Sequence, residues 1–244
     1  SDITTGSLNA IIGSGAGKNT TTGSSNSAMG HNTLYANTTG IENVALGAFA
    51  AGQHTASYRV CVGKSAGQWS SANGATLIGR KAGMGSAITE ATGAYTVAVG
   101  YESLQALTTG GWNTAVGGSS GTSVSEGHNN ILIGYKAGED ITTADNNVII
   151  GGFSGFGHGL DLRTNGNKLV LSTGATDARP ILYGTSTGAV TIPGGATDIE
   201  WTTATGGLRF SGIAGTTYLQ WSRPSTQTGS IYFARFHHNN AEIG

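Results

Sequence analysis

The chain contains little charge, little proline and almost no cysteine. Of its 244 residues, 10% are charged, three are proline and one, Cys61, is cysteine, whereas an average soluble domain has about 25% charged residues. A single cysteine excludes an intramolecular disulfide framework. The 12 basic and 13 acidic residues balance, so no nucleic-acid partner is expected. No apolar run reaches the roughly 18 residues of a membrane-spanning helix.

Glycine is the residue present in excess. The chain has 42 glycines, well above the average share of about 7%. They follow no Gly-X-Y period, which excludes a collagen triple helix. An apolar content of 37% and a net charge of −1 do not suit a disordered chain. These features predict a folded, glycine-rich protein and favour internal repeats.

A short pattern, Asn-x-apolar-apolar-Gly, recurs along the first two thirds of the chain. Its motif glycines are 16 or 17 residues apart, except for one step of 21, and they are Gly13, Gly30, Gly47, Gly63, Gly79, Gly100, Gly117, Gly134 and Gly151. Such a period is too short for a βαβ unit. It predicts one β-solenoid coil per repeat, with two short strands and two turns. The long step predicts a loop around residues 84–92.

The three residues before each motif glycine predict a short strand that is apolar on both faces. Asparagine stands four positions before the glycine in six of the nine repeats. Stacking in register predicts that these side-chain amides form a hydrogen-bonded ladder between coils. The ladder residues are Asn9, Asn26, Asn43, Asn113, Asn130 and Asn147.

A strand that is apolar on both faces needs two burial sites. The narrow interior of a coil accommodates one face, and we expect the Ala-rich face, which includes Ala98 and Ala115, to be buried against identical chains. This predicts an obligate homo-oligomer, with a trimer as the expected closure. Cys61 occupies a slot that alanine often fills in other repeats, so we expect a buried and inert thiol.

The period ends after Gly155, where short apolar runs begin to alternate with turn residues. All three prolines lie in this part. We therefore predict a repeat shaft over residues 1–156 and an all-β C-terminal tip domain over residues 157–244. The strand-like runs are Lys168–Ser172, Ile181–Tyr183, Ala189–Ile192, Ile199–Thr202, Leu208–Ser211, Tyr218–Ser222 and Ser230–Phe236.

Aromatic and polar residues of the C-terminal part are candidates for receptor binding, because amphipathic aromatic side chains are favoured at recognition surfaces. The candidates are Trp201, Tyr218, Trp221, Arg223, His237 and His238. The alternative for each aromatic residue is that it fills the core of the tip. The two histidines could also contribute to a metal site on a threefold axis. Neighbouring strand residues point to opposite sides, however, so no metal is expected.

No catalytic residue and no cofactor are predicted. Gly63–Gly67 and Gly117–Gly121 match the G-x-S-x-G nucleophile elbow, but their glycines recur in other repeats without the serine, and no strand-to-helix turn is expected. Asp198 and Glu200 share a face of a predicted strand and could form a glycosidase pair. Solvated carboxylates are the simpler interpretation. The run Gly13–Lys18 lacks the spacing of a phosphate-binding loop.

Three stretches resemble the repeats of bacteriophage tail fibres and the head repeats of trimeric autotransporter adhesins: NTTGIENVALGAFAAG (37–52), TTGGWNTAVGGSSG (108–121) and NNILIGYKAGED (129–140). The resemblance covers residues 4–155 and implies a left-handed parallel β-roll in an intertwined homotrimer. The last segment, Gly229–Gly244, resembles the one that precedes the self-cleaving intramolecular chaperone of phage tail fibres. That resemblance implies that Gly244 is the C-terminus left by cleavage.

The resemblance also implies a function. A tail fibre of the virion would attach the phage, as a homotrimer, to a bacterial cell-surface glycan or outer-membrane protein, with other tail proteins at its N-terminal side. Several weak contacts in parallel would give firm adsorption. The alternatives are a polysaccharide-degrading tailspike and the head of a bacterial trimeric adhesin.

Overall fold

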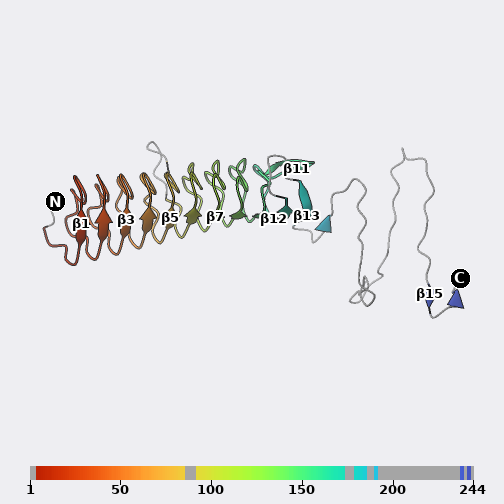
Figure 1. The fold of residues 1–244 in the computed structure, drawn as a ribbon, viewed down its shortest axis with the longest axis horizontal. Helices are drawn as coiled ribbons and strands as arrows, with labels where there is room; N and C mark the ends of the chain where they lie inside the picture. The colour runs from red at the N-terminus through yellow and green to blue at the C-terminus, as the bar shows by residue number, and fades with distance from the viewer. Residues whose placement is uncertain are drawn as a thin grey trace. The chain divides into compact units, whose positions relative to one another are not determined.

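The computed structural model describes residues 4–85, 92–173, 179–185, 190–191, 237–238 and 241–242, and over these ranges it is all-β without a helix. The chain divides into two units, Ser1–Gly195 and Ala196–Gly244. The first unit is a β-solenoid of stacked coils (Figure 1). In the second unit, β15 (His237–His238) and β16 (Ala241–Glu242) form an antiparallel pair.

Nine three-residue strands, one from each repeat, form a parallel sheet in which each strand pairs with its sequence neighbours. The strands are β1 (Ala10–Ile12), β2 (Ser27–Met29), β3 (Val44–Leu46), β4 (Val60–Val62), β5 (Thr76–Ile78), β6 (Val97–Val99), β7 (Thr114–Val116), β8 (Ile131–Ile133) and β9 (Val148–Ile150). Equivalent residues are aligned, so that Ala115 lies between Ala98 and Leu132. The repeat period thus sets the register of the sheet.

The sheet continues beyond the repeats. Strand β12 (Lys168–Ser172), which coincides with a predicted run, pairs in parallel with β9. It is followed by antiparallel β13 (Pro180–Thr185) and β14 (Val190–Thr191). Between β9 and β12, β10 (Phe156–Gly157) and β11 (Leu160–Asp161) form a small hairpin. Of the loop predicted around residues 84–92, residues 86–91 lie outside the described residues.

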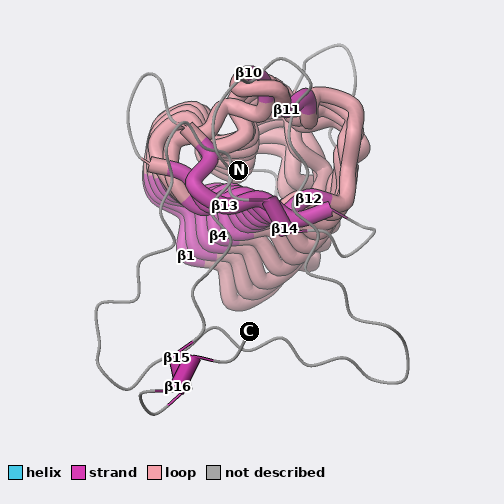
Figure 2. The backbone as a smooth tube through the Cα atoms, turned by 90° about the vertical axis from the view of Figure 1, so that its right-hand side faces the viewer, coloured by secondary structure: helices cyan, strands magenta, loops and turns pink. Residues whose placement is uncertain are grey.

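Each described coil contains one strand, and the expectation of two strands was wrong. The rest of the coil consists of turns in which several non-glycine residues have a left-handed backbone, such as Glu42 (φ 54°), Phe49 (φ 61°) and Ala51 (φ 48°). Left-handed residues redirect the chain, so a second extended segment cannot form there. Backbone hydrogen bonds still join the coils through the turns, as between Gly17 N–H and Thr33 O at 2.8 Å. The end-on view in Figure 2 shows this stacking of the turns.

The motif glycines are required by the close approach of successive coils. Their φ angles lie between 115° and 141°, a region that residues with a Cβ rarely adopt. A Cβ on Gly63 would lie 2.6 Å from the carbonyl oxygen of Gly79 in the next coil. The same backbone contact recurs along the column, which explains why each repeat ends in glycine.

The predicted asparagine ladder is present in two runs. In the first, Nδ2 of Asn26 donates to Oδ1 of Asn9 at 3.0 Å, and Nδ2 of Asn43 donates to Oδ1 of Asn26 at 2.9 Å. In the second, Asn130 and Asn147 make the equivalent bonds at 3.1 Å each. Because each Oδ1 also accepts the backbone N–H of the next ladder residue, the amides satisfy polar groups inside the coils.

Arg59 replaces asparagine at the end of the first run. Its buried guanidinium donates to Oδ1 of Asn43 at 3.4 Å, to Ser70 O at 2.7 Å and to His54 O at 3.3 Å. Burial lowers the pKa of Arg59, because desolvation disfavours its charged form. Ala75 and Thr96 occupy the next two ladder positions before the second run begins at Asn113.

The coil interior is filled by pairs of residues whose sizes compensate. Each pair consists of the middle residue of a strand and the residue six positions later. Where the strand residue is large, as with Leu77 and Leu132, its partner is Gly83 or Gly138, and a Cβ on Gly138 would lie 2.7 Å from Cδ2 of Leu132. Where the strand residue is Ala28 or Ala98, the partner is Leu34 or Leu104, which is fully buried. Large and small residues therefore compensate within these coils. At Ala115 the neighbouring coils compensate instead, because a Cβ on its partner Gly121 would lie 2.8 Å from Cδ2 of Leu104 and 2.8 Å from Cδ1 of Leu132.

Candidate interaction surfaces

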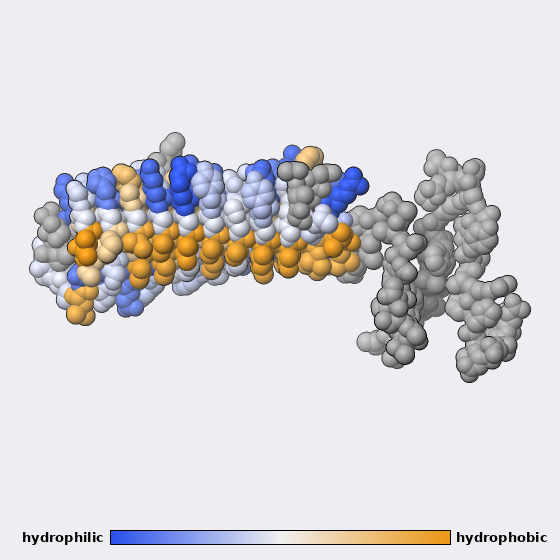
Figure 3. Space-filling model, in the orientation of Figure 1, coloured by the Kyte–Doolittle hydropathy of each residue, from blue (hydrophilic) through white to orange (hydrophobic). Residues whose placement is uncertain are grey.

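The outward face of the solenoid sheet carries two columns of apolar side chains, from the first and third residues of each strand. Its most exposed large members are between 38% and 61% exposed, and they are Ile12, Met29, Val44, Leu46, Ile78, Val116, Ile131, Ile133 and Ile150. Figure 3 shows them as a continuous apolar band along the solenoid. We call this surface the sheet face. Parallel sheets are normally covered on both faces, and an exposed apolar patch of this extent is typical of an interaction surface.

The expectation that the Ala-rich face points away from the coil was wrong. Ala98 and Ala115 lie in the coil interior and are fully buried within the single chain. The interior is narrow, so it accommodates alanine together with a leucine, which comes from the same coil at Ala98 (Leu104) and from neighbouring coils at Ala115. The larger and β-branched residues of the strand then point outward. The two-faced apolar strand was predicted, but the assignment of its faces was reversed.

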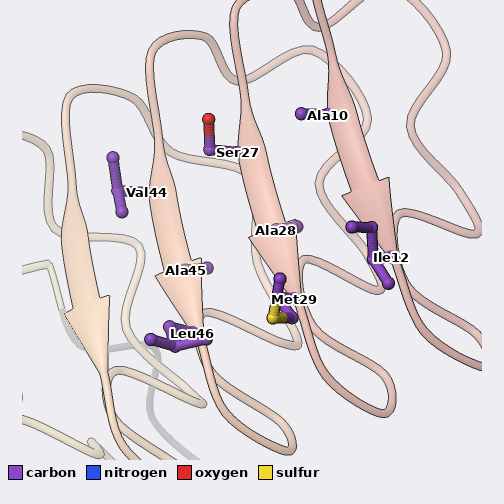
Figure 4. A pocket seen from close by; sticks show the side chains of 8 residues that line it. All are labelled: Ala10, Ile12, Ser27, Ala28, Met29, Val44, Ala45 and Leu46. Carbon is purple, nitrogen blue, oxygen red and sulfur yellow. The ribbon is translucent and has the colours of Figure 1, made fainter.

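The sheet face is hollowed at its N-terminal end. Eight residues of β1, β2 and β3 line a shallow groove of about 220 Å³ (Figure 4). It arises because Ala10 and Ser27 are smaller than Val44, which occupies the same column in the next coil. The wall is formed by Ile12, Met29 and Leu46. These side chains offer contacts to an apolar group and almost no hydrogen-bonding atoms, so the groove suits a hydrophobic side chain.

A second surface is a column of exposed aromatic residues, which the sequence analysis missed. Tyr58, Tyr95 and Trp112 each stand two residues before a strand and are 56%, 63% and 57% exposed. The rings of Tyr95 and Trp112 stack at a centroid distance of 6.5 Å and an interplanar angle of 21°. His128 continues the row, with its ring 6.1 Å from that of Trp112. The signal was available, since all three aromatic residues stand five positions before a motif glycine.

Most of the predicted receptor-binding residues lie outside the described residues: Trp201, Tyr218, Trp221 and Arg223. Gly244, the predicted processing point, and the Asp198 and Glu200 pair also lie outside them. His237 and His238 form β15, where they pair with Glu242 and Ala241 respectively.

The repeat accounts for both G-x-S-x-G strings. Ser65 and Ser119 have φ angles of 60° and 55°, similar to the 60° of Lys81 and Lys136 at the equivalent position of other coils. The expected burial of Cys61 is confirmed, because its side chain is fully buried in the coil interior. Burial raises the pKa of the Cys61 thiol, which favours its neutral form.

Within the described ranges, no group of three or more His, Cys, Asp or Glu residues is arranged to hold a metal ion. The same residues form no helix with the length and apolarity needed to span a membrane. Comparison of the chain with family models, with curated proteins and with solved structures finds no match in any of the three.

Proposed function

We propose that the chain is a segment of a bacteriophage tail fibre, which attaches the virion to a bacterial surface as a homotrimer. The observation that carries the proposal is the sheet face: a rigid, repetitive coil stack presents one continuous apolar band along its length. The apolar side chains of this band repeat once per coil, at the spacing between coils. A second and third copy of the same chain can therefore match it coil by coil.

Self-association explains why the sheet face is apolar. Burying an exposed Val, Leu or Ile side chain contributes about 1.5–3 kcal/mol, and the band repeats this contribution in coil after coil. Three copies would enclose the sheet faces around a common axis. The resemblance to tail-fibre repeats supports a trimer with left-handed, intertwined coils, and it supports other tail proteins as partners at the N-terminal side.

Attachment would use a bacterial cell-surface glycan or an outer-membrane protein as receptor. In this proposal the C-terminal residues 157–244 form the tip, which begins with the strands that extend the solenoid sheet. Its candidate contacts are Trp201, Tyr218, Trp221, Arg223, His237 and His238. Each trimer presents three copies of every contact. Weak individual contacts therefore combine into firm adsorption.

Sedimentation of the purified chain tests the assembly. We expect a trimer at micromolar concentration, and we expect Ile133→Lys to weaken it, because a charge would be buried in the sheet face. Thr143→Lys is the matched control, since it adds the same charge at an exposed turn. A folded monomer of the unchanged chain would overturn the homotrimer.

Adsorption tests the attachment role. Labelled protein is incubated with a panel of bacterial strains, and we expect strain-selective binding that unlabelled protein competes away. Failure to bind any strain to which the intact fibre adsorbs would contradict attachment by this chain. Release of shortened oligosaccharides from bound cells would instead favour the polysaccharide-degrading tailspike.

A further inference from the structure

Tyr95, Trp112 and His128 form what we call the aromatic row, and the backbone of the coils holds its rings in place. Tyr95 and Trp112 have left-handed backbones (φ 55° and 56°). Their N–H groups donate to Asn73 O and Ala94 O in the preceding coils, each at 3.0 Å. Gly74 precedes Tyr95 in the column, and a Cβ there would lie 2.8 Å from Cδ1 of the tyrosine ring. The glycine thus leaves space for the ring, and the coils fix where both rings stand.

Polar groups of low net charge border this row. The backbone N–H of His128 donates to Oδ1 of Asp145 at 2.6 Å, and Nδ1 of His128 lies 3.6 Å from the same oxygen. Ala94 is half-buried, and its N–H has no acceptor among the described residues. In other coils a side chain of the next coil accepts this bond, as Asn73 does for Ser57. The next coil here supplies Gly111, which has no side chain. The row therefore combines open aromatic surface with an available donor.

We propose that Tyr95, Trp112 and His128 form a binding site for a neutral polysaccharide, lying along the flank of the solenoid. A sugar ring offers an apolar C–H face that packs on an aromatic ring, and hydroxyl groups that exchange hydrogen bonds with polar neighbours. The Ala94 N–H and the His128–Asp145 pair are placed to meet such hydroxyls. The site lies within the described solenoid and rests on the proposed function only for the cell-surface source of the polysaccharide.

Charge and surroundings favour a glycan over a nucleic acid. A single strand of nucleic acid also stacks on aromatic rings, but it needs a cationic groove that follows its phosphates. Residues 92–100 and 108–117 of the two coils contain no lysine and no arginine. The acidic group at the row, Asp145, would repel phosphate. A protein partner, including a second copy of this chain, remains as an outcome of the test.

The test measures binding of the purified full chain to immobilised neutral O-polysaccharides and neutral capsular polysaccharides of bacteria. We expect binding to at least one of them and an apparent affinity loss of about tenfold or more for Trp112→Ala and Tyr95→Ala, the scale of a lost aromatic stack. Trp112→Tyr should retain most of the binding, because it keeps an aromatic ring. The variants should fold, since both side chains are more than half exposed and alanine places no new Cβ on the left-handed backbone.

Tyr58→Ala is the matched control. Tyr58 holds the equivalent position two coils before Tyr95 and is 56% exposed. Gly74 separates it from Tyr95 in the column, and within the described residues its ring stacks on no other aromatic ring. Its replacement should leave polysaccharide affinity within twofold.

Equal affinity of Trp112→Ala and the unchanged chain would overturn the proposal, as would absence of binding to every neutral polysaccharide. A change in sedimentation for Trp112→Ala would assign the row to a contact between chains. If Trp112→Ala binds polysaccharide as tightly as the unchanged chain while strain-selective adsorption to cells persists, the site is overturned and the attachment role stands.

Discussion

Nδ2 of Asn130 donates a hydrogen bond to Oδ1 of Asn113, 3.1 Å away in the preceding coil. The same Nδ2 donates to Ala144 O at 2.9 Å, and Oδ1 of Asn130 accepts the backbone N–H and Nδ2 of Asn147 at 3.0 and 3.1 Å. All of these groups are buried. One amide therefore satisfies polar atoms in three successive coils, which makes the ladder a determinant of both stability and register.

Replacement of Asn130 by alanine should destabilise the solenoid strongly. It leaves the buried Asn147 N–H and Ala144 O without partners, so the free energy of unfolding should fall by about 2–4 kcal/mol. Urea denaturation at a fixed protomer concentration measures the change. Asn19→Ala is the control, since the half-buried Asn19 side chain makes no hydrogen bond to the described residues. Similar urea midpoints for the two variants would contradict a structural role of the ladder.

Two adjacent glycines should respond differently to the same substitution. Gly117 has a φ of 141°, and a Cβ there would lie 2.6 Å from the carbonyl carbon of Gly134. Gly118 has no left-handed φ, and its Cβ would meet Tyr135 at an ordinary 3.5 Å. We expect Gly117→Ala to lower the melting temperature by several degrees, consistent with a loss of about 1–3 kcal/mol. Gly118→Ala should leave it nearly unchanged. Equal melting temperatures would show that the coils can separate at the glycine column.

The sequence determines the register of the coils more directly than the direction of their faces. Asn130 and the motif glycine Gly134 recur at a fixed spacing, so stacking in register aligns every ladder amide and the strands between them. The inward direction of Ala98 was not apparent, because the strand is apolar on both faces. It depends on Leu104, six residues later, which fills the space that alanine leaves. The second strand was wrongly expected because left-handed backbones at residues such as Phe49 have no clear sequence signal.

The ion pair beside the β10–β11 hairpin should titrate at low pH. Arg163 donates from Nε and Nη2 to the carboxylate of Asp161 at 3.0 and 2.7 Å, and these bonds lower the pKa of Asp161 to about 2, from an ordinary 3.8. A lowered pKa means that the folded state favours the carboxylate. The resulting stabilisation is present above about pH 4 and is lost as the pH falls to about 2.

Arg163→Gln tests this coupling. The pKa of Asp161 should rise toward 3.8 in the variant, because its strongest hydrogen bonds are lost. Carboxyl chemical shifts followed by NMR during an acid titration report the value. Lys168→Gln is the control, since Nζ of Lys168 donates to Gly166 O rather than to Asp161. An unchanged Asp161 titration in Arg163→Gln would contradict the ion pair.

The size compensation inside the coils predicts that the large and the small side chain of one coil can be exchanged between their two positions. Ala98→Leu alone should lower the free energy of unfolding by about 1–3 kcal/mol, because it overfills the interior. It should also cost more than Thr108→Leu, since Thr108 is only half-buried at a turn.

Combining Ala98→Leu with Leu104→Gly recreates the arrangement of Leu132 with Gly138, and glycine accepts the left-handed backbone at Leu104 (φ 49°). The double variant should therefore be more stable than the sum of the single variants predicts, by about 1–3 kcal/mol in a double-mutant cycle. Strict additivity would mean that residues 98 and 104 do not share one packing space. The effect of a size change at one position on stability would then not depend on the residue at the other.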